Sequence, residues 1–228
     1  MRNLAVIQHT ESEYLGLIED HFEGRNIRFQ YIRPFLGMDK LPGEAVGDGL
    51  VLLGAGPYGV VSGHILPSLS RELRLTTAYL EAGLPVLAFG LGAVILSVAA
   101  GGGAQESELD FALQHAKATA SGHLQGHLPA SLPLACYLRD KPILPPNAEV
   151  LAINEKAEPL IFSVGKHALG FLGHPGMKRG MIEDLIMEFE QTPDDCITPL
   201  EALGAAQQEI AEKLTPLMVG VVAHAGWM

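Results

Sequence analysis

The chain has 228 residues, of which 48% are hydrophobic, and a formal net charge of −11. This length suits one α/β domain with peripheral additions, and the apolar content excludes an intrinsically disordered chain. The acidic charge and the absence of any Lys/Arg cluster exclude a surface that tracks phosphates. We therefore expect no nucleic-acid partner and no anionic membrane partner.

The sequence carries no signal for export or membrane insertion. Its first apolar run is too short for a secretory signal segment, and no stretch of about 18 uninterrupted apolar residues predicts a membrane span. The two cysteines, Cys136 and Cys196, fit a reducing compartment. We expect a cytoplasmic protein with free thiols.

The first hundred residues alternate strand and helix patterns. The predicted elements, in chain order, are a strand at 3–8, a helix at 11–24, strands at 26–32 and 48–54, a helix at 69–83, a strand at 84–89 and a helix at 93–100. Such alternation predicts a mostly parallel sheet that helices cover on both faces, with ligands at the carboxyl ends of its strands.

Beyond the triple glycine at 101–103 the pattern changes. Three closely spaced strand candidates, 148–154, 159–165 and 167–174, predict an antiparallel section. A helix is expected at 181–190.

The last part of the chain predicts a helix over 198–214 with Thr198 as its N-cap, followed by an apolar tail that we expect to dock on the domain. We divide the chain into a domain over 1–190 and a C-terminal helical extension over 191–228.

One stretch, "LPVLAFGLGAVILSVAAGGG" (84–103), combines a buried strand, a glycine turn and a helix. A strand-to-helix elbow of this kind presents its central residue beside the backbone N–H groups that begin the helix, which suits a catalytic nucleophile. Here the central residue is Gly90, which has no side chain to attack a substrate.

The segment "PVLAFGLGAVIL" resembles, without a gap, the elbow of the class I glutamine amidotransferases, whose pattern is Pro-Val-Leu-Gly-Ile-Cys-Leu-Gly-Ala-Gln-Leu-Leu. "DGLVLLGAGP" (48–57) is similar to the family's strand and oxyanion loop, "LPPNAEVLAINE" (144–155) to the segment after its Trp-His-Gly-Asp, and "GFLGHPGM" (170–177) to its His-Pro-Glu segment. The resemblance covers roughly residues 3–190 and implies the flavodoxin-like fold of that family.

In that family a Cys attacks the glutamine amide, a His moves the proton and a Glu orients the His. Carried over by position, the Cys falls on Gly90, the His on His174 and the Glu on Gly176. The family's elbow Gln, the Gln before its His-Pro pair and its Trp-His-Gly-Asp are also replaced, by Val94, Leu172 and residues 137–140. The resemblance therefore implies a member that lacks the nucleophile and the triad acid, with His174 vestigial.

Without a thiolate no acyl-enzyme can form, so we expect no ordinary glutaminase activity. The backbone N–H groups of Gly54, Ala55, Gly56 and Leu91 need no particular side chain to bind a small carboxylate or amide. No cofactor or metal is expected.

Our first hypothesis is a noncatalytic or regulatory subunit that binds a synthetase or transferase. A second is altered chemistry at the same pocket, with His174 as general base. A third is a sensor that binds glutamine or another carboxylate without turnover.

Two other motifs carry weaker signals. "GAGPYG" (54–59) satisfies the dinucleotide pattern G-x-G-x-x-G, but no helix pattern begins within it and no acidic residue ends the next strand. His123 and His127 are four apart, but they lie in a segment rich in Gly and Pro with no third ligand nearby. We interpret the first as an oxyanion-type loop and the two histidines as surface residues.

Overall fold

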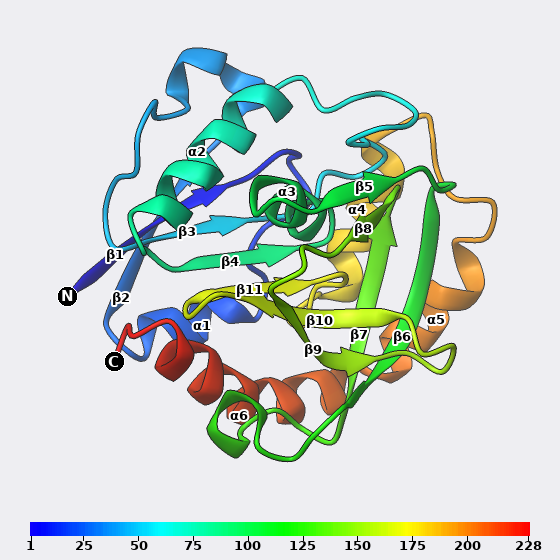
Figure 1. The fold of residues 1–228 in the computed structure, drawn as a ribbon. Coiled ribbons are helices and arrows are strands. Elements are labelled where there is room, and N and C mark those ends of the chain that lie inside the picture. Colours follow the sequence, from blue (N-terminus) through cyan, green and yellow to red (C-terminus); the bar gives the residue numbers. More distant parts are fainter.

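The computed structural model describes residues 1–228 and has one large sheet of nine strands in the order β2-β1-β3-β4-β11-β10-β9-β6-β7 (Figure 1). The strands of this sheet are β1 (Arg2–Ile7), β2 (Ile27–Ile32), β3 (Gly49–Leu52), β4 (Val86–Phe89), β6 (Asp110–Ala118), β7 (Ser131–Leu138), β9 (Ala148–Ile153), β10 (Pro159–Val164) and β11 (Ala168–Phe171). Strands β5 (Gly103–Gln105) and β8 (Lys141–Ile143) form a separate antiparallel pair.

The large sheet has a parallel and an antiparallel part. Strands β2, β1, β3, β4 and β11 are parallel to one another, so their carboxyl ends meet at one edge. From β11 onward, β10, β9, β6 and β7 pair antiparallel. Every residue of β3, β4 and β11 is buried, as expected for strands covered on both faces. The predicted α/β class with a mostly parallel sheet and an antiparallel section is confirmed.

Helices cover both faces of the parallel part. The helices are α1 (Ile18–Glu23), α2 (Leu69–Glu81), α3 (Leu91–Ala99), α4 (Arg179–Glu188), α5 (Ile197–Ala205) and α6 (Gln207–His224), with short 3-10 turns η1 (Pro34–Leu36), η2 (Met38–Lys40) and η3 (His123–Gly126). Helices α2 and α3 contact each other above the parallel strands, whereas α1 and α6 lie together below them (Figure 1).

The C-terminal tail docks on the domain through the second half of α6 and the residues that follow it. Leu217, Val221 and Trp227 are buried in the main hydrophobic core. The indole N–H of Trp227 donates to the carbonyl oxygen of Asp48 at 3.0 Å, and its ring meets that of Phe22 edge-on at 5.9 Å. The tail therefore ties the end of the chain to the beginning of β3.

The predicted helix over 11–24 is wrong in its first half, since only Ile18–Glu23 is helical. Residues 8–17 form a loop because Gly16 adopts a positive φ of 61° and because the Glu188 carboxylate accepts the backbone N–H groups of Glu11 and Ser12. These tertiary hydrogen bonds replace those of a first helical turn.

The predicted helix over 198–214 is also wrong in its boundaries. Two helices, α5 and α6, meet at Ala206, and the second continues through Pro216 to His224. Cys196, rather than Thr198, occupies the N-cap position of α5, and the carboxylate of Asp195 just before it accepts the N–H groups of Ile197 and Thr198. None of the helices combines the length and the apolar character that crossing a membrane requires.

Candidate functional site

Gly90 lies at the turn between β4 and α3, with φ 54° and ψ −123°. Side chains with a β-carbon rarely adopt this conformation, which is typical of the strained turn that presents a nucleophile. The Gly90 N–H donates to the carbonyl oxygen of Phe171 at 2.9 Å, which holds the turn against the neighbouring strand. A β-carbon on Gly90 would lie 3.3 Å from the Cα of Gly54, so the elbow faces the loop after β3.

His174 follows β11 and is buried behind this elbow, with its ring stacked on Phe89 at 5.0 Å. Its Nδ1 accepts the Gly176 N–H at 3.1 Å, so the ring proton is on Nε2, which donates to the Tyr14 carbonyl oxygen at 2.9 Å. Burial lowers the pKa of His174 to about 4. At neutral pH the imidazole is uncharged and both of its nitrogens are engaged with the protein.

The space beside Gly176 is filled by the start of α1. A β-carbon on Gly176 would lie 3.0 Å from Cγ1 and 3.2 Å from the backbone nitrogen of Ile18. A carboxylate side chain at this position therefore requires α1 to move. The backbone carbonyl of Tyr14 accepts the Nε2–H of His174 and so fixes the orientation of the ring.

Glu13 is a site residue that sequence reasoning missed. Its side chain is buried, and its Oε2 accepts the N–H of Gly56 at 2.5 Å. A β-carbon on Gly54 would overlap Glu13 Oε1, so the carboxyl lies directly on the loop of residues 54–56. Burial raises the pKa of Glu13 to about 7, although the Gly56 N–H and the charge of His9 act in the opposite direction.

A buried pair, His9 and Glu72, contacts the same loop at the carbonyl of Gly54. His9 Nδ1 lies 2.9 Å from the Gly54 carbonyl oxygen, and its Nε2 lies 2.7 Å from Oε2 of Glu72. Because both partners are acceptors, His9 donates from both nitrogens and carries a positive charge. Burial alone would lower the pKa of His9, but the Glu72 carboxylate and the other contacts together raise it by more. The pair fixes the orientation of the Gly54 peptide.

Asp140 holds the continuation of the loop. Its Oδ2 accepts the N–H groups of Val60 at 2.7 Å and Val61 at 2.8 Å, and its Oδ1 is bonded to the Ser62 hydroxyl. Burial would raise the pKa of Asp140, but these hydrogen bonds lower it overall. Next to it, the Arg139 Nε–H donates to the Pro57 carbonyl oxygen at 3.1 Å.

The predicted site residues thus meet at the carboxyl edge of the parallel strands. Gly90, Gly176 and His174 lie there, together with the predicted oxyanion-type donors, which are Gly54, Ala55, Gly56 and Leu91. All of them are buried. The sequence pattern placed Glu13 on a helix and gave no sign of its role, because its position depends on the loop of residues 8–17.

The two other motifs are placed as follows. After β3 the chain forms a loop until α2 begins at Leu69, so no helix starts within residues 54–59. His123 begins the 3-10 turn η3, where its Nε2 is 2.7 Å from the Thr119 hydroxyl and its Nδ1 is 3.5 Å from the Glu149 carboxylate.

Comparison with solved structures identifies the fold. A glutamine amidotransferase from Thermotoga maritima is similar with a TM-score of 0.80 and 22% identity, over 98% of each chain. A glutamine amido transferase from Methylobacillus flagellatus has a TM-score of 0.80 and 20% identity, over 98% of this chain and 95% of the other. A putative GMP synthase component from Thermoplasma acidophilum has a TM-score of 0.59 and 16% identity, over 93% of this chain and 98% of the other.

No family model matches the sequence, and a search of curated proteins found no match. The structural likeness nevertheless covers almost the whole chain, so the predicted class I glutamine amidotransferase fold is confirmed. In its fold, this chain is a glutamine amidotransferase-like protein.

Proposed function

We propose that this protein has no glutaminase activity and acts as a noncatalytic or regulatory subunit of a synthetase or transferase complex. The observation that carries the proposal is Gly90, which stands in the nucleophile's turn without a side chain. A covalent amide transfer needs a nucleophile at that point, and none is supplied.

No other thiol replaces the missing one. Cys136 is buried, which raises the pKa of its thiol to about 12, and burial with the nearby Asp195 charge raises the pKa of Cys196. Reactive cysteines have a lowered pKa, because the thiolate is the nucleophile. Both side chains therefore fit a structural role.

The loop of residues 54–56 is occupied from within the chain. The Glu13 carboxyl takes the Gly56 N–H, which is one of the donors that would otherwise bind a substrate oxygen. A ligand at this loop would have to displace a buried carboxyl. This arrangement weighs against the sensor hypothesis at this particular place.

Altered chemistry with His174 as general base has less support than the subunit role. A general base needs an unprotonated nitrogen within reach of its substrate. In His174 the unprotonated Nδ1 accepts the Gly176 N–H, and Nε2 donates to Tyr14. The imidazole serves to pack the loop of residues 14–17 against the end of β11.

Exposed apolar side chains and the similar structures support a protein partner. Four of these side chains lie on the loops that follow β2 and β3, namely Phe35, Leu36, Val61 and Ile65. Because β2 and β3 are both parallel to β1, these loops leave the same edge of the sheet. A contiguous apolar patch is typical of a protein interface, and we infer that this edge carries the contact surface for the partner. One similar structure is described as a component of a putative GMP synthase, and another as PurLQS from Thermotoga maritima, with a TM-score of 0.54.

The test combines an activity assay with a search for the partner. We expect the purified full-length chain to release no ammonia from glutamine. We expect Gly90→Cys to stay inactive, because both nitrogens of His174 are engaged, by Gly176 and by Tyr14, and neither is free to take the proton of a thiol. Affinity purification from the native source should recover a synthetase or transferase in stoichiometric amount. Ammonia release by the unmodified chain that is lost in His174→Ala would refute the proposal.

A further inference from the structure

A cavity of about 920 Å³ lies on the antiparallel part of the molecule. It opens between β6, the turn that joins β9 to β10, and the segment before α5. Gly90, His174 and Glu13 do not line it, so it is separate from the elbow. Its volume is in the range of pockets that hold small-molecule ligands, about 300–1,000 Å³.

The floor of the cavity is apolar. It includes Cys136 and Leu138 of β7, Leu160 of β10 and Leu172, which follows β11. Leu172 stands where the amidotransferase pattern has a glutamine, so one polar group has been exchanged for an apolar contact surface. A ligand over this floor gains affinity by covering apolar side chains.

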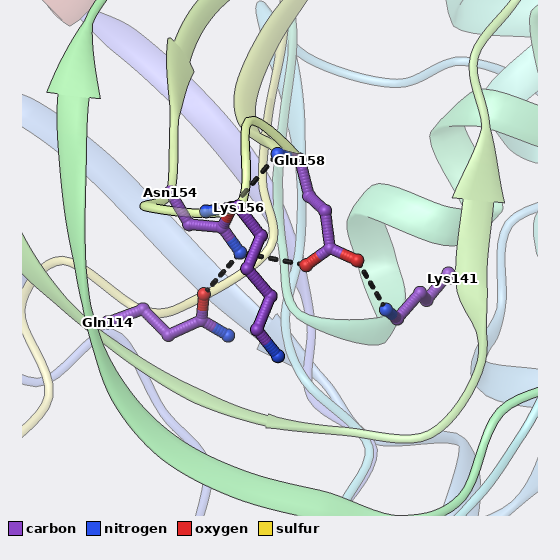
Figure 2. Close-up of polar contacts among 5 residues, drawn as sticks. All are labelled: Gln114, Lys141, Asn154, Lys156 and Glu158. Carbon is purple, nitrogen blue, oxygen red and sulfur yellow. Dashed lines mark hydrogen bonds and ion pairs between the residues drawn. The ribbon is translucent and has the colours of Figure 1, made fainter.

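At one end of the cavity five lining residues lie close together in a network of polar contacts, namely Gln114, Lys141, Asn154, Lys156 and Glu158 (Figure 2). The Asn154 amide N–H group donates to Gln114 Oε1 at 2.9 Å and to Glu158 at 2.8 Å, and Glu158 also pairs with Lys141 at 2.8 Å. This network leaves the amide nitrogen of Gln114 and the ammonium group of Lys156 without an acceptor in the protein. Together they suit a carboxylate.

The opposite end is acidic. Seven carboxylates and two lysines line the cavity. Two of the carboxylates, Glu155 and Glu158, flank Lys156 at the first end, and they are engaged within the chain by Lys117 and by Asn154 and Lys141. Glu108, Asp110 and Asp194 have neither an ion pair nor a hydrogen bond within the chain. These three lie toward the start of β6 and the segment before α5, where they suit an ammonium group.

The distance between the two ends limits the ligand. Asp110 and Gln114 are four residues apart on the same strand, and both line the cavity. Four residues of a strand span about 13 Å, and extended peptides reach about 3.3–3.6 Å per residue. A single amino acid is therefore too short to meet both ends, whereas an extended tripeptide, helped by the reach of the side chains, is long enough.

We propose that this cavity binds a short peptide of about three residues. Its N-terminal ammonium lies at Asp110, its C-terminal carboxylate lies at Gln114 and Lys156, and an apolar side chain rests on Leu138, Leu160 and Leu172. The site is independent of the proposed subunit role, because Gly90, Gly176, His174 and Glu13 do not line it. Asp140, which holds the loop after β3, borders both regions.

The experiment is calorimetric titration of the full-length chain with the tripeptide Ala-Leu-Ala, its N-acetylated form and its C-amidated form. We expect saturable binding of the free tripeptide and about tenfold weaker binding of each blocked form, for the loss of one charge-assisted contact. Asp110→Asn should weaken the binding of the free peptide about tenfold and leave the binding of the acetylated peptide unchanged. In the same way, Lys156→Ala should leave the affinity for the C-amidated peptide unchanged.

Glu106→Gln is the matched control, because Glu106 is an exposed acid near β6 that does not line the cavity. It should bind the free tripeptide as the unmodified chain does. No saturable binding, or binding that ignores both terminal blocks, overturns the proposal. The proposal would also be overturned if spermidine bound more tightly than the tripeptide and Lys156→Ala left that binding unchanged. The cavity would then be an amine site without an end for a carboxylate.

Discussion

Around Gly90, the side chains of Glu13, His174 and His9 are buried and bonded within the chain, whereas the cavity beside β6 holds charged side chains with no partner in the chain. The elbow has the backbone geometry of a reactive site but has been filled by the protein's own groups. The cavity has no strand-to-helix turn of this kind, but it has open space and charged side chains without partners. The backbone geometry typical of catalysis therefore lies at the Gly90 elbow, whereas the space and charges that suit ligand binding lie in the cavity beside β6.

The contrast between the two regions reflects a general property of buried polar groups. A buried carboxyl or imidazole is tolerated only when it is hydrogen-bonded or neutral. In the elbow region those conditions are met by internal contacts, so changes there should cost stability. At the rim of the cavity the same groups face solvent, so changes there should affect ligand binding and leave stability almost unchanged.

The largest expected effect is at His9. His9→Ala leaves the carboxylate of Glu72 buried without its cation, which should lower the free energy of unfolding by about 3–5 kcal/mol. Urea denaturation measures it. His64→Ala, at an exposed histidine on the loop after β3, is the matched control and should change the value by less than about 0.5 kcal/mol. A small effect at His9 would mean that the pair does not carry charge.

Glu13 gives a pH dependence of defined sign. Its pKa is raised from 4.5 to about 7, so the folded state holds a proton that the unfolded state has released between these values. Glu13 therefore lowers stability progressively as pH rises from 4.5 to 7, by about 3 kcal/mol in all. Glu13→Gln, which keeps an acceptor for Gly56, should match the stability of the native chain below pH 4.5 and exceed it by that amount at pH 8. Urea denaturation across this pH range measures the difference.

His174 provides an internal comparison with the opposite sign. Its pKa is lowered to about 4, so the unfolded state binds the extra proton between pH 4 and 6.5, and this imidazole makes stability rise with pH over that window. His174→Gln should remove that rise. For the Glu13 prediction, the contradicting outcome is a pair of parallel curves of stability against pH for Glu13→Gln and the native chain. They would show that Glu13 is ionised in the fold.

The start of α1 beside Gly176 leaves little space for an acidic side chain at that residue. Gly176→Glu should lower the free energy of unfolding by about 1–3 kcal/mol, because its side chain has to push Ile18 aside. Gly180→Glu introduces the same side chain at an exposed position with no atom within 4 Å, and it should not destabilise the protein. Equal stability of the two variants would contradict the close packing at residue 176.

The smallest effect is expected at the cavity rim. Lys141→Ala removes an ion pair with Glu158 in which both side chains are about half exposed, so the loss should be below about 1 kcal/mol. Thermal denaturation at low and high salt measures it. A larger loss of stability would mean that the contacts at the cavity rim stabilise the fold, as those at the elbow do.

Much of the fold could be predicted from the sequence, and the successes have a common cause. Strands β3 and β4 and helix α3 are specified locally by continuous apolar runs and by the glycine turn at residue 90, so their order predicted the parallel sheet. Strand β6 mixes exposed and buried side chains on both of its faces, with the charged Asp110 and Lys117 on opposite faces, and no expected element covered it. The loop at residues 11–17 and the break between α5 and α6 at Ala206 were also missed. Contacts with neighbouring segments, rather than the local sequence pattern, decide where these helices begin and end.

The sequence by itself determined that residues 90 and 176 are glycines and that the first of them lies in a strand-to-helix turn. Only the tertiary structure decided what occupies that space, because Glu13, Tyr14 and Ile18 reach it through a loop whose course depends on Gly16 and Glu188. Local patterns specify strands and turns through short-range sterics and burial. Which buried groups become hydrogen-bond partners depends on contacts between segments that lie more than a hundred residues apart, as with Tyr14 and His174.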